Sequence, residues 1–329
     1  MRANRPSLVF LNGIGDHFIN LPAIRAVANL FPRQLSIICR AGAAELFCNL
    51  PTRSVHEINW GLDQRDQVLA SDYVVDLLTS CDLLISLNPW HTDAVDRMLA
   101  RVNPPMSVGF FAAFSEHVQL DFEKHSAELA YDIPRALGSL DLIAQHSGPP
   151  ALPNWAESAA NNLFRSLPSG SRVLAIHPET LAEKMWCLDK LGVLIDAFFD
   201  CHPNYYAFVI GVSNLSLDRG RHAARVIPCN GLPFYASAAL VANADLFLGV
   251  DSCMLHVADI FRVPSVGLFG PTNPFEFGFR LTEVHCHVTG DGTMSSIEVP
   301  QVLMAMECVE RRASQVSSSR RVLLQEAPY

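Results

Sequence analysis

The sequence predicts an α/β protein made of two domains, each with a parallel sheet. Short apolar segments typical of buried strands alternate with segments of helical spacing along the whole chain. A stretch rich in Pro and Gly, residues 147–153, has no helical period and separates two halves of similar length. The chain has 329 residues, enough for two domains of ordinary size. We therefore expect one domain over residues 1–150 and a second over residues 151–329.

The first half is expected to alternate strands with helices. Strands are expected at Leu8–Asn12, Leu35–Cys39, Asp82–Leu87 and Ser107–Phe111. Helices are expected at Ile19–Phe31, Ala43–Leu50, Asp93–Arg101 and, with an interruption at Pro134, Leu129–Ala144. Pro22 suits the first turn of the first of these helices, and the turn before it is formed by residues 13–16.

The second half repeats the alternation. Strands are expected at Arg172–Ile176, Tyr205–Gly211, Ala244–Gly249 and Pro264–Phe269. Helices are expected at Trp155–Leu167, Leu188–Asp200, Val299–Arg312 and after Asp251 or Ser252, either of which can cap a helix start. The tail from Ser314 is expected to be frayed surface.

Composition and charge exclude several classes of function. Hydrophobic residues make up 50% and charged residues 17%, a balance typical of a globular protein. The net charge of −9 argues against a nucleic-acid surface or an anionic membrane as partner. No apolar run approaches the roughly 20 residues of a transmembrane helix, and the N-terminus makes a poor signal peptide, so we expect a cytoplasmic protein. The nine cysteines include no C-x-x-C pair, and we expect neither a metal site nor a cofactor.

The segment from Asn243 to Pro274 predicts an anion site in the second half. A buried strand ends at Gly249, and a helix starts directly after it, near Ser252. The first N–H groups of a helix have no partner within the helix, and together with the helix dipole they favour phosphate. His256 lies further along this helix, where a core histidine is the alternative to a ligand contact.

A polar segment follows the strand Arg172–Ile176, at the edge of the sheet where ligands bind in α/β proteins. Within it, Lys184 supplies a mobile positive charge suited to a diphosphate, and Thr180 supplies a hydroxyl donor. The alternative is that Lys184 is a solvated loop charge and that Trp186 only covers the seam between the two domains.

The turn Gly13-Ile14-Gly15-Asp16 follows the first strand of the chain. Its two glycines let backbone approach a ligand, and Asp16 can act either as a general base for a hydroxyl or as a helix cap. A dinucleotide site, with Arg40 as an NADP contact, is the weaker interpretation, because Phe18 occupies the position of the third glycine.

These three segments, in this order and spacing, resemble the heptosyltransferases, family 9 of the glycosyltransferases. The resemblance rests on the Gly13–Asp16 turn with Pro22, on His177 with Lys184 and Trp186, and on two stretches near the end. The last two are Asp251-Ser252-Cys253-Met254-Leu255-His256 and, after Pro264, Phe269-Gly270-Pro271-Thr272-Asn273-Pro274.

The resemblance implies the GT-B arrangement, two Rossmann-like domains facing across a cleft. The first would bind the acceptor and the second a nucleotide-diphosphate sugar, usually ADP-heptose. Transfer would be inverting and independent of metal. Asp16 would deprotonate the acceptor hydroxyl, and Lys184 would stabilise the departing diphosphate. The donor-binding residues would be Gly13, Gly15, Thr180, Lys184, Asp251, Ser252, Cys253 and His256.

Two departures from the family pattern bear on the substrate. Cys253 replaces the usual glycine after Asp-Ser, which changes how closely backbone can approach the donor. Residues 1–150 contain 11 Lys and Arg against 16 Asp and Glu, whereas a domain for phosphorylated lipopolysaccharide should be basic. We therefore expect a neutral or cationic acceptor, such as a specialised metabolite or a protein side chain. The alternatives are a non-catalytic nucleotide-sugar-binding protein and a nucleotide-sugar epimerase or hydrolase.

Overall fold

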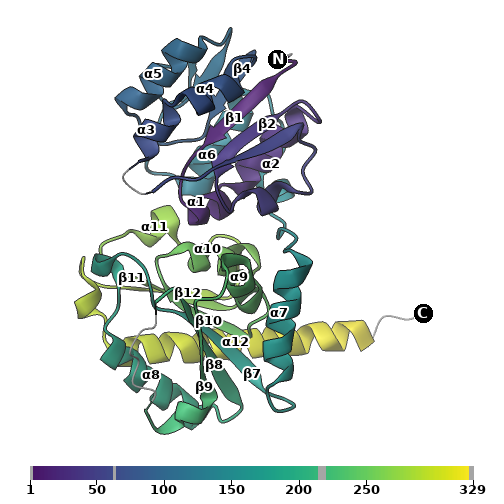
Figure 1. Cartoon of the computed structure of the whole chain (residues 1–329). Coiled ribbons are helices and arrows are strands. Elements are labelled where there is room, and N and C mark those ends of the chain that lie inside the picture. Colours follow the sequence, from purple (N-terminus) through teal and green to yellow (C-terminus); the bar gives the residue numbers. More distant parts are fainter. Residues whose placement is uncertain (1–2, 62–63, 214–219, 326–329) are drawn as a thin grey trace. The chain divides into compact units, whose positions relative to one another are not determined.

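The computed structural model describes residues 3–61, 64–213 and 220–325, with side chains up to Val316. The chain divides into two compact units, Met1–Ala151 and Leu152–Tyr329, called unit 1 and unit 2 below (Figure 1). The division falls one residue after the boundary expected from the Pro- and Gly-rich stretch.

Unit 1 is a parallel sheet covered by helices. Its strands are β1 (Pro6–Phe10), β2 (Ser36–Arg40), β3 (Ser54–Ile58), β4 (Leu83–Ser86), β5 (Ser107–Gly109) and β6 (Glu116–His117). Its α-helices are α1 (Ile14–Ile19), α2 (Leu21–Leu30), α3 (Arg65–Leu69), α4 (Asp72–Leu78), α5 (Asp93–Val102) and α6 (Ser126–Ala136). Short 3₁₀ turns occupy Ala44–Phe47 and Ile143–His146. The strand order is β3-β2-β1-β4-β5-β6, and the registered pairs are parallel.

Unit 2 repeats this plan. Its strands are β7 (Arg172–His177), β8 (Tyr205–Gly211), β9 (Val226–Asn230), β10 (Leu246–Val250), β11 (Ser265–Phe269) and β12 (His285–Thr289). Its α-helices are α7 (Asn154–Arg165), α8 (Leu188–Cys201), α9 (Phe234–Ala242), α10 (Cys253–Ile260), α11 (Pro274–Phe277) and α12 (Val299–Gln325). Short 3₁₀ segments occupy Ala182–Lys184, Gly220–Arg225 and Met294–Ser296.

The strand order of unit 2, β12-β11-β10-β7-β8-β9, is the same as that of unit 1 once the strands are counted within each unit. In both units the first strand lies in the middle, next to the fourth strand. Chain connections leave this central pair in opposite directions, which makes it the switch point where doubly wound folds bind ligands. The switch points are β1/β4 in unit 1 and β7/β10 in unit 2.

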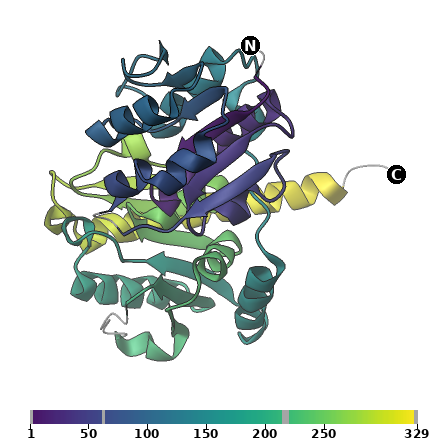
Figure 2. The ribbon, with the colours of Figure 1, turned by 45° about the horizontal axis from the view of Figure 1, so that its top comes forward.

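Helices cover both faces of each sheet, as Figures 1 and 2 show. In unit 2, α8 and α12 pack together on one face, and α7, α9 and α10 pack on the other. The core under α8 and α12 combines Phe198 and Phe199 with strand residues such as Leu174 and Leu248, all fully buried. Since the inner strands, such as β10 and β11, are buried on both faces, they read as continuous apolar runs, the pattern expected of parallel sheets.

Most expected elements are present, with shifts of one or two residues at their ends, and β8 has the expected bounds. The first expected helix is wrong in detail, because α1 already begins at Ile14 and is separated from α2 at Asn20. The turn expected at residues 13–16 is therefore mostly helix. The expected interruption at Pro134 is also wrong, since α6 runs through Pro134 and ends at Ala136.

The frayed tail expected from Ser314 is wrong as far as Gln325, because α12 continues to that residue. Two contacts hold the helix at this point. Arg172 at the start of β7 pairs with Glu310, and the Ser314 hydroxyl donates to the same carboxylate at 2.9 Å. The last four residues of the expected tail lie outside the described part of the chain.

A buried carboxylate fixes the loop that follows α11. Oδ1 of Asp259, near the end of α10, accepts hydrogen bonds from three consecutive backbone N–H groups, those of Arg280, Leu281 and Thr282, at 2.8–3.0 Å. Asp259 is 8% exposed, and burial raises the pKa of its carboxyl group although these hydrogen bonds oppose the rise. The carboxylate thus takes the place of water for backbone groups that the fold has removed from solvent.

We expect Asp259→Ala to lower the free energy of unfolding by about 3 kcal/mol, because it leaves three backbone N–H groups without their acceptor. Asp259→Asn keeps one side-chain oxygen and should lose about half as much. Urea unfolding measures both variants. Glu283→Ala, at an exposed carboxylate of the same loop, is the control and should change stability by no more than about 0.5 kcal/mol. Equal effects of Asp259→Ala and Glu283→Ala would contradict this role.

Candidate functional site

The candidate site of unit 2 lies at the carboxyl ends of β7 and β10, the two strands of its switch point. Asp251 and Ser252 directly follow β10, and the segment Pro178–Cys187 follows β7. Register pairs Gly249 with His177, so the two strands end side by side. Residues about 70 positions apart in the sequence are thereby brought together, as the two expected anion-binding segments required.

An ion pair joins the two segments. Lys184 Nζ lies 2.8 Å from Asp251 Oδ2, and the two side chains are 23% and 7% exposed. The alternative that Lys184 is a solvated loop charge is therefore wrong. An ammonium group has three N–H donors, so the contact with Asp251 leaves donors for a ligand.

Thr180 lies beside this pair but directs its hydroxyl inward. Its Oγ1 donates to the backbone carbonyl of Asp251 at 3.1 Å. In this arrangement the Thr180 hydroxyl hydrogen is already used within the protein. The role of Thr180 as a hydrogen-bond donor to diphosphate stays a prediction, and it requires this bond to be exchanged.

His177 and Ser252 form a second link across the switch point. His177 Nδ1 lies 2.8 Å from Ser252 Oγ, and the histidine is 7% exposed. Burial lowers the pKa of His177 to about 4, against a smaller opposite influence of Glu179. His177 is therefore neutral at physiological pH. Sequence reasoning used His177 only as part of a motif and did not assign it to the site; its position at a strand end was the available signal.

Glu179 anchors the segment after β7 to the neighbouring strand. Its carboxylate accepts from the backbone N–H groups of Val212 and Ser213 and from the Ser213 hydroxyl. Burial would raise the pKa of Glu179, but these hydrogen bonds outweigh it and hold the pKa below its usual value. Gly211 lacks a side chain where this carboxylate passes, and a Cβ there would lie 2.6 Å from Glu179 Oε2.

The helix start after Asp251 follows the expectation in part. Ser252 is the N-cap of α10, although its side chain makes no capping hydrogen bond, and Cys253 is the first helical residue. Asp251 precedes the helix, the placement that the five-residue spacing to His256 required. Burial raises the pKa of the Cys253 thiol to about 11, so Cys253 is a neutral thiol at physiological pH. Donor contacts of Cys253 and His256 stay predictions.

The candidate site of unit 1 lies at the carboxyl end of β1. Gly13 is the N-cap of α1, Gly15 lies within its first turn, and Asp16 Oδ2 accepts from the Gly13 N–H at 2.9 Å. Asp16 is thus not the N-cap, but as the third residue of α1 it accepts the N–H of the N-cap residue. A carboxylate can accept about four hydrogen bonds, so the capping bond does not prevent Asp16 from also serving as a base.

His17 contacts the backbone on both sides of this turn. Its Nδ1 and Nε2 lie 2.8 and 3.1 Å from the carbonyl oxygens of Gly13 and Phe10, and its side chain is fully buried. Burial lowers the pKa of His17 to about 4, and nearby Arg40 adds to this. A neutral ring has one N–H, so one of the two carbonyl contacts is a hydrogen bond at neutral pH.

Aromatic residues at the same edge of unit 1 were not singled out from the sequence. Trp90, which follows β4, donates from Nε1 to Asn12 Oδ1 at 2.8 Å and lies under the Arg65 guanidinium, 3.7 Å from the ring centroid. Arg40 lies over Trp60 at 4.7 Å. Trp60 and Trp90 each follow a strand, which is the signal that could have identified them.

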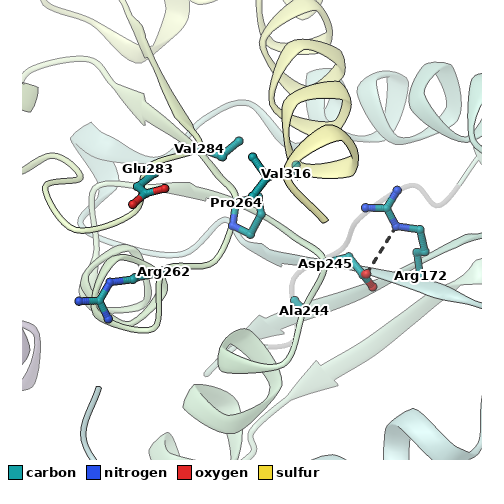
Figure 3. A pocket seen from close by; sticks show the side chains of 9 residues that line it. Arg172, Ala244, Asp245, Arg262, Pro264, Glu283, Val284 and Val316 are labelled. Carbon is teal, nitrogen blue, oxygen red and sulfur yellow. Dashed lines mark ion pairs between the residues drawn. The ribbon is translucent and has the colours of Figure 1, made fainter. Parts of the chain in front are cut away.

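A pocket of unit 2 lies at the edge of the sheet opposite to the candidate site (Figure 3). Its volume is about 310 Å³, and Arg172 and Asp245, which form an ion pair at 3.5 Å, line it together with Arg262 and Glu283. These residues begin or precede strands, so the pocket lies at the amino ends. It contains none of the expected site residues.

The described part of the chain lacks two kinds of feature. Among those residues, no group of three or more His, Cys, Asp or Glu is arranged to hold a metal ion. Within the same ranges, no helix has the length and apolarity needed to cross a membrane.

The two buried histidines predict an acid-sensitive fold. The ordinary pKa of His17 and His177 is 6.5, and both fall to about 4 in the folded protein. Between pH 7.5 and 5 the unfolded chain therefore gains protons that the folded protein does not, and stability falls as pH falls. The loss at pH 5 is about 2 kcal/mol per histidine.

Urea unfolding at pH 7.5 and pH 5 measures this loss. His17→Gln and His177→Gln should each show a fall in stability between the two pH values that is about 2 kcal/mol smaller than that of the unsubstituted protein. Because each variant is compared with itself at the two pH values, the direct effect of the substitution on the free energy of unfolding cancels. A fall as large as that of the unsubstituted protein in both variants would disprove the assignment.

Comparisons with known proteins concern the family and the fold of the chain. Residues 217–296 match the family described as glycosyltransferase family 9 (heptosyltransferase). No curated protein matches the chain in sequence. A family 9 glycosyl transferase from Veillonella parvula DSM 2008 has a similar structure, with a TM-score of 0.76 and 17% identity, over 94% of this chain and 97% of that one.

Two Escherichia coli structures are also similar. ADP-heptose LPS heptosyltransferase II gives a TM-score of 0.70, and heptosyltransferase WaaC with ADP gives 0.69; each is 16% identical and covers 94% of this chain and 99% of its own. The expected fold, two Rossmann-like α/β domains of the GT-B class, is thus confirmed. The resemblance to family 9 glycosyltransferases, first seen in three motifs, is confirmed by the family match over residues 217–296.

Proposed function

We propose that the protein is an inverting glycosyltransferase that moves a sugar from a nucleotide-diphosphate donor to an acceptor hydroxyl. The observation that carries the proposal is the cluster at the unit 2 switch point, where Lys184, Asp251 and Ser252 come together. The cluster offers a cation with donors to spare, a fixed carboxylate and a hydroxyl. The family match and the GT-B fold support the same class of enzyme.

The donor we propose is ADP-heptose. Two of the similar structures are named as heptosyltransferases, and WaaC was determined with ADP. In our proposal, Lys184 and the start of α10 contact the diphosphate, and Asp251 contacts sugar hydroxyls. Thr180, Cys253 and His256 complete the donor site, and Gly13 and Gly15 let backbone of unit 1 approach the ligand.

Asp16 is the proposed base. It accepts the proton of the acceptor hydroxyl while that oxygen forms a bond to the anomeric carbon. The bond from this carbon to the diphosphate oxygen breaks, and its electron pair leaves with the nucleoside diphosphate. Negative charge builds on the diphosphate in the transition state, where the Lys184 ammonium stabilises it more than in the ground state. We propose that no metal takes part.

The acceptor we propose is a specialised metabolite or a protein side chain. The acidic balance of residues 1–150 supports a neutral or cationic acceptor. Arg40 and Arg65, however, place cations on the edge that carries Asp16. A panel of acceptors should therefore include anionic compounds.

The cytoplasmic location expected from the sequence stays a prediction.

Donor binding is the first test. We expect calorimetry to show ADP binding more tightly than UDP, GDP or NADPH. Lys184→Ala should weaken ADP binding about tenfold, since one charge-assisted contact is lost. Lys190→Ala is the matched control, because Lys190 in the same unit contacts Ser295, Ile297 and Glu298. Binding of NADPH alone, or of no nucleoside diphosphate, would rule out the proposed donor class.

The second test is transfer. With ADP-heptose and the acceptor panel, Asp16→Asn should lower the rate of ADP release by 10²- to 10⁴-fold and leave ADP affinity unchanged. Asp76→Asn, at an exposed carboxylate on α4, should keep the full rate. Addition of EDTA should not change the rate.

The outcomes of this assay separate the alternatives. Full activity of Asp16→Asn would show that Asp16 is not the base. Turnover of donor without acceptor would favour an epimerase or hydrolase. Donor binding without turnover over the whole panel would favour a non-catalytic binding protein.

A further inference from the structure

The contact between His177 and Ser252 joins the two sides of the unit 2 switch point. His177 is the last residue of β7, and Ser252 is the N-cap of α10, directly after β10. The Ser252 hydroxyl does not cap its own helix; its oxygen lies 2.8 Å from His177 Nδ1 instead. Ser252 is partly exposed, whereas His177 is buried. The contact therefore connects a residue that a ligand can reach with one that it cannot.

The number of protons decides what Ser252 can offer. A serine hydroxyl has one hydrogen, and phosphate oxygens at neutral pH are acceptors only. If Ser252 donates to His177, it has no hydrogen left for a phosphate. If His177 donates from Nδ1, the Ser252 hydrogen is available for a ligand. A neutral imidazole has one N–H, so its tautomer determines which case holds.

The other hydrogen bonds of the site show why the direction of the His177–Ser252 hydrogen bond matters. The hydroxyl of Thr180 already donates to the Asp251 carbonyl, and the Asp251 carboxylate accepts from Lys184. Of the two hydroxyls in the cluster, Ser252 is thus the one whose hydrogen the protein can leave to an anion. The diphosphate of the proposed donor is an anion of this kind.

The His177 side chain is shielded from solvent, with 7% of its surface exposed. Strand register pairs His177 with Gly249, two residues before Asp251, so the ring lies at the strand end where α10 begins. In this position Nδ1 is directed at Ser252 Oγ.

We infer that His177 is a positioning residue for the donor: its Nδ1–H donates to Ser252 Oγ and so directs the Ser252 hydroxyl to a phosphate oxygen of the nucleoside diphosphate. This inference rests on the proposed function, since it concerns the same donor site. His177 acts only through Ser252 and does not contact the donor itself.

A double-mutant cycle tests the inference, with ADP as the probe and the full chain as the protein. Ser252→Ala should weaken ADP binding about tenfold, the value of one hydrogen bond to a charged group. His177→Leu should weaken it about as much, because Ser252 loses its orientation. The double variant should bind no more weakly than Ser252→Ala alone, since both substitutions remove the same contact.

His177→Asn serves as the rescue variant. The asparagine side-chain N–H can take the place of Nδ1–H, so ADP affinity should stay within about threefold of that of the unsubstituted protein. Thermal unfolding of each variant shows whether the fold is intact. Poor binding by both His177→Leu and His177→Asn, with both folded, would overturn the inference.

Nitrogen NMR of histidine-labelled protein reads the tautomer directly, with and without ADP. We expect the proton of His177 on Nδ1 in both states. A proton on Nε2, or full ADP affinity of His177→Leu, would overturn the inference and leave the proposed function standing. Failure of the unsubstituted protein to bind ADP, UDP or GDP would overturn the proposed function and the inference with it.

Discussion

Parallel pairing is the constraint on which the functional arrangement of this protein depends. Because all strands of a sheet run the same way, their carboxyl ends meet at one edge, and each crossover starts there. At the switch point two crossovers diverge, and the polar segments that begin them lie at this edge. In unit 2 these segments carry Lys184 and Asp251, and in unit 1 the equivalent position carries Asp16. The unit 2 arrangement joins residues that are far apart in the sequence.

Each polar group at the unit 2 switch point would be costly to bury alone. Together they satisfy one another's charges and hydrogen bonds. A buried carboxylate such as Asp251 needs a cation, and Lys184 supplies it. The backbone carbonyl of Asp251 is paired with Thr180, and His177 stays neutral while in contact with Ser252. The site is thus organised before any ligand binds, which lowers the entropy cost of binding.

The two units have the same strand order but carry different side chains at their switch points. Unit 2 places an ion pair and a hydroxyl at its switch point, a combination suited to an anion. Unit 1 places Asp16 on a short helix and braces the turn with His17, and it surrounds the edge with Trp60, Trp90 and the arginines stacked on them. Duplication of a strand order therefore says little about chemistry, which is set by the side chains that follow each strand.

Helical period and apolar runs in the sequence were enough to identify the α/β class, the inner strands and most long helices. They failed at outer strands such as β3, β9 and β12, whose residues alternate irregularly between buried and exposed and so lack a continuous apolar run. They also failed at α12 beyond Arg312, where the ion pair of Glu310 with Arg172 holds the helix. Such contacts join residues far apart in the chain, and local pattern carries no information about them.

The site, like the fold, was predicted from the sequence only in part. The sequence by itself determined which residues could serve, because a lone lysine after a strand, an Asp-Ser pair before a helix and a Gly-rich turn each have their own chemistry. Only the tertiary structure decided how they are connected: Lys184 with Asp251, Thr180 turned inward, and His177 against Ser252. The physical reason is that hydrogen bonds and ion pairs depend on distances of about 3 Å, which strand register sets and sequence spacing does not.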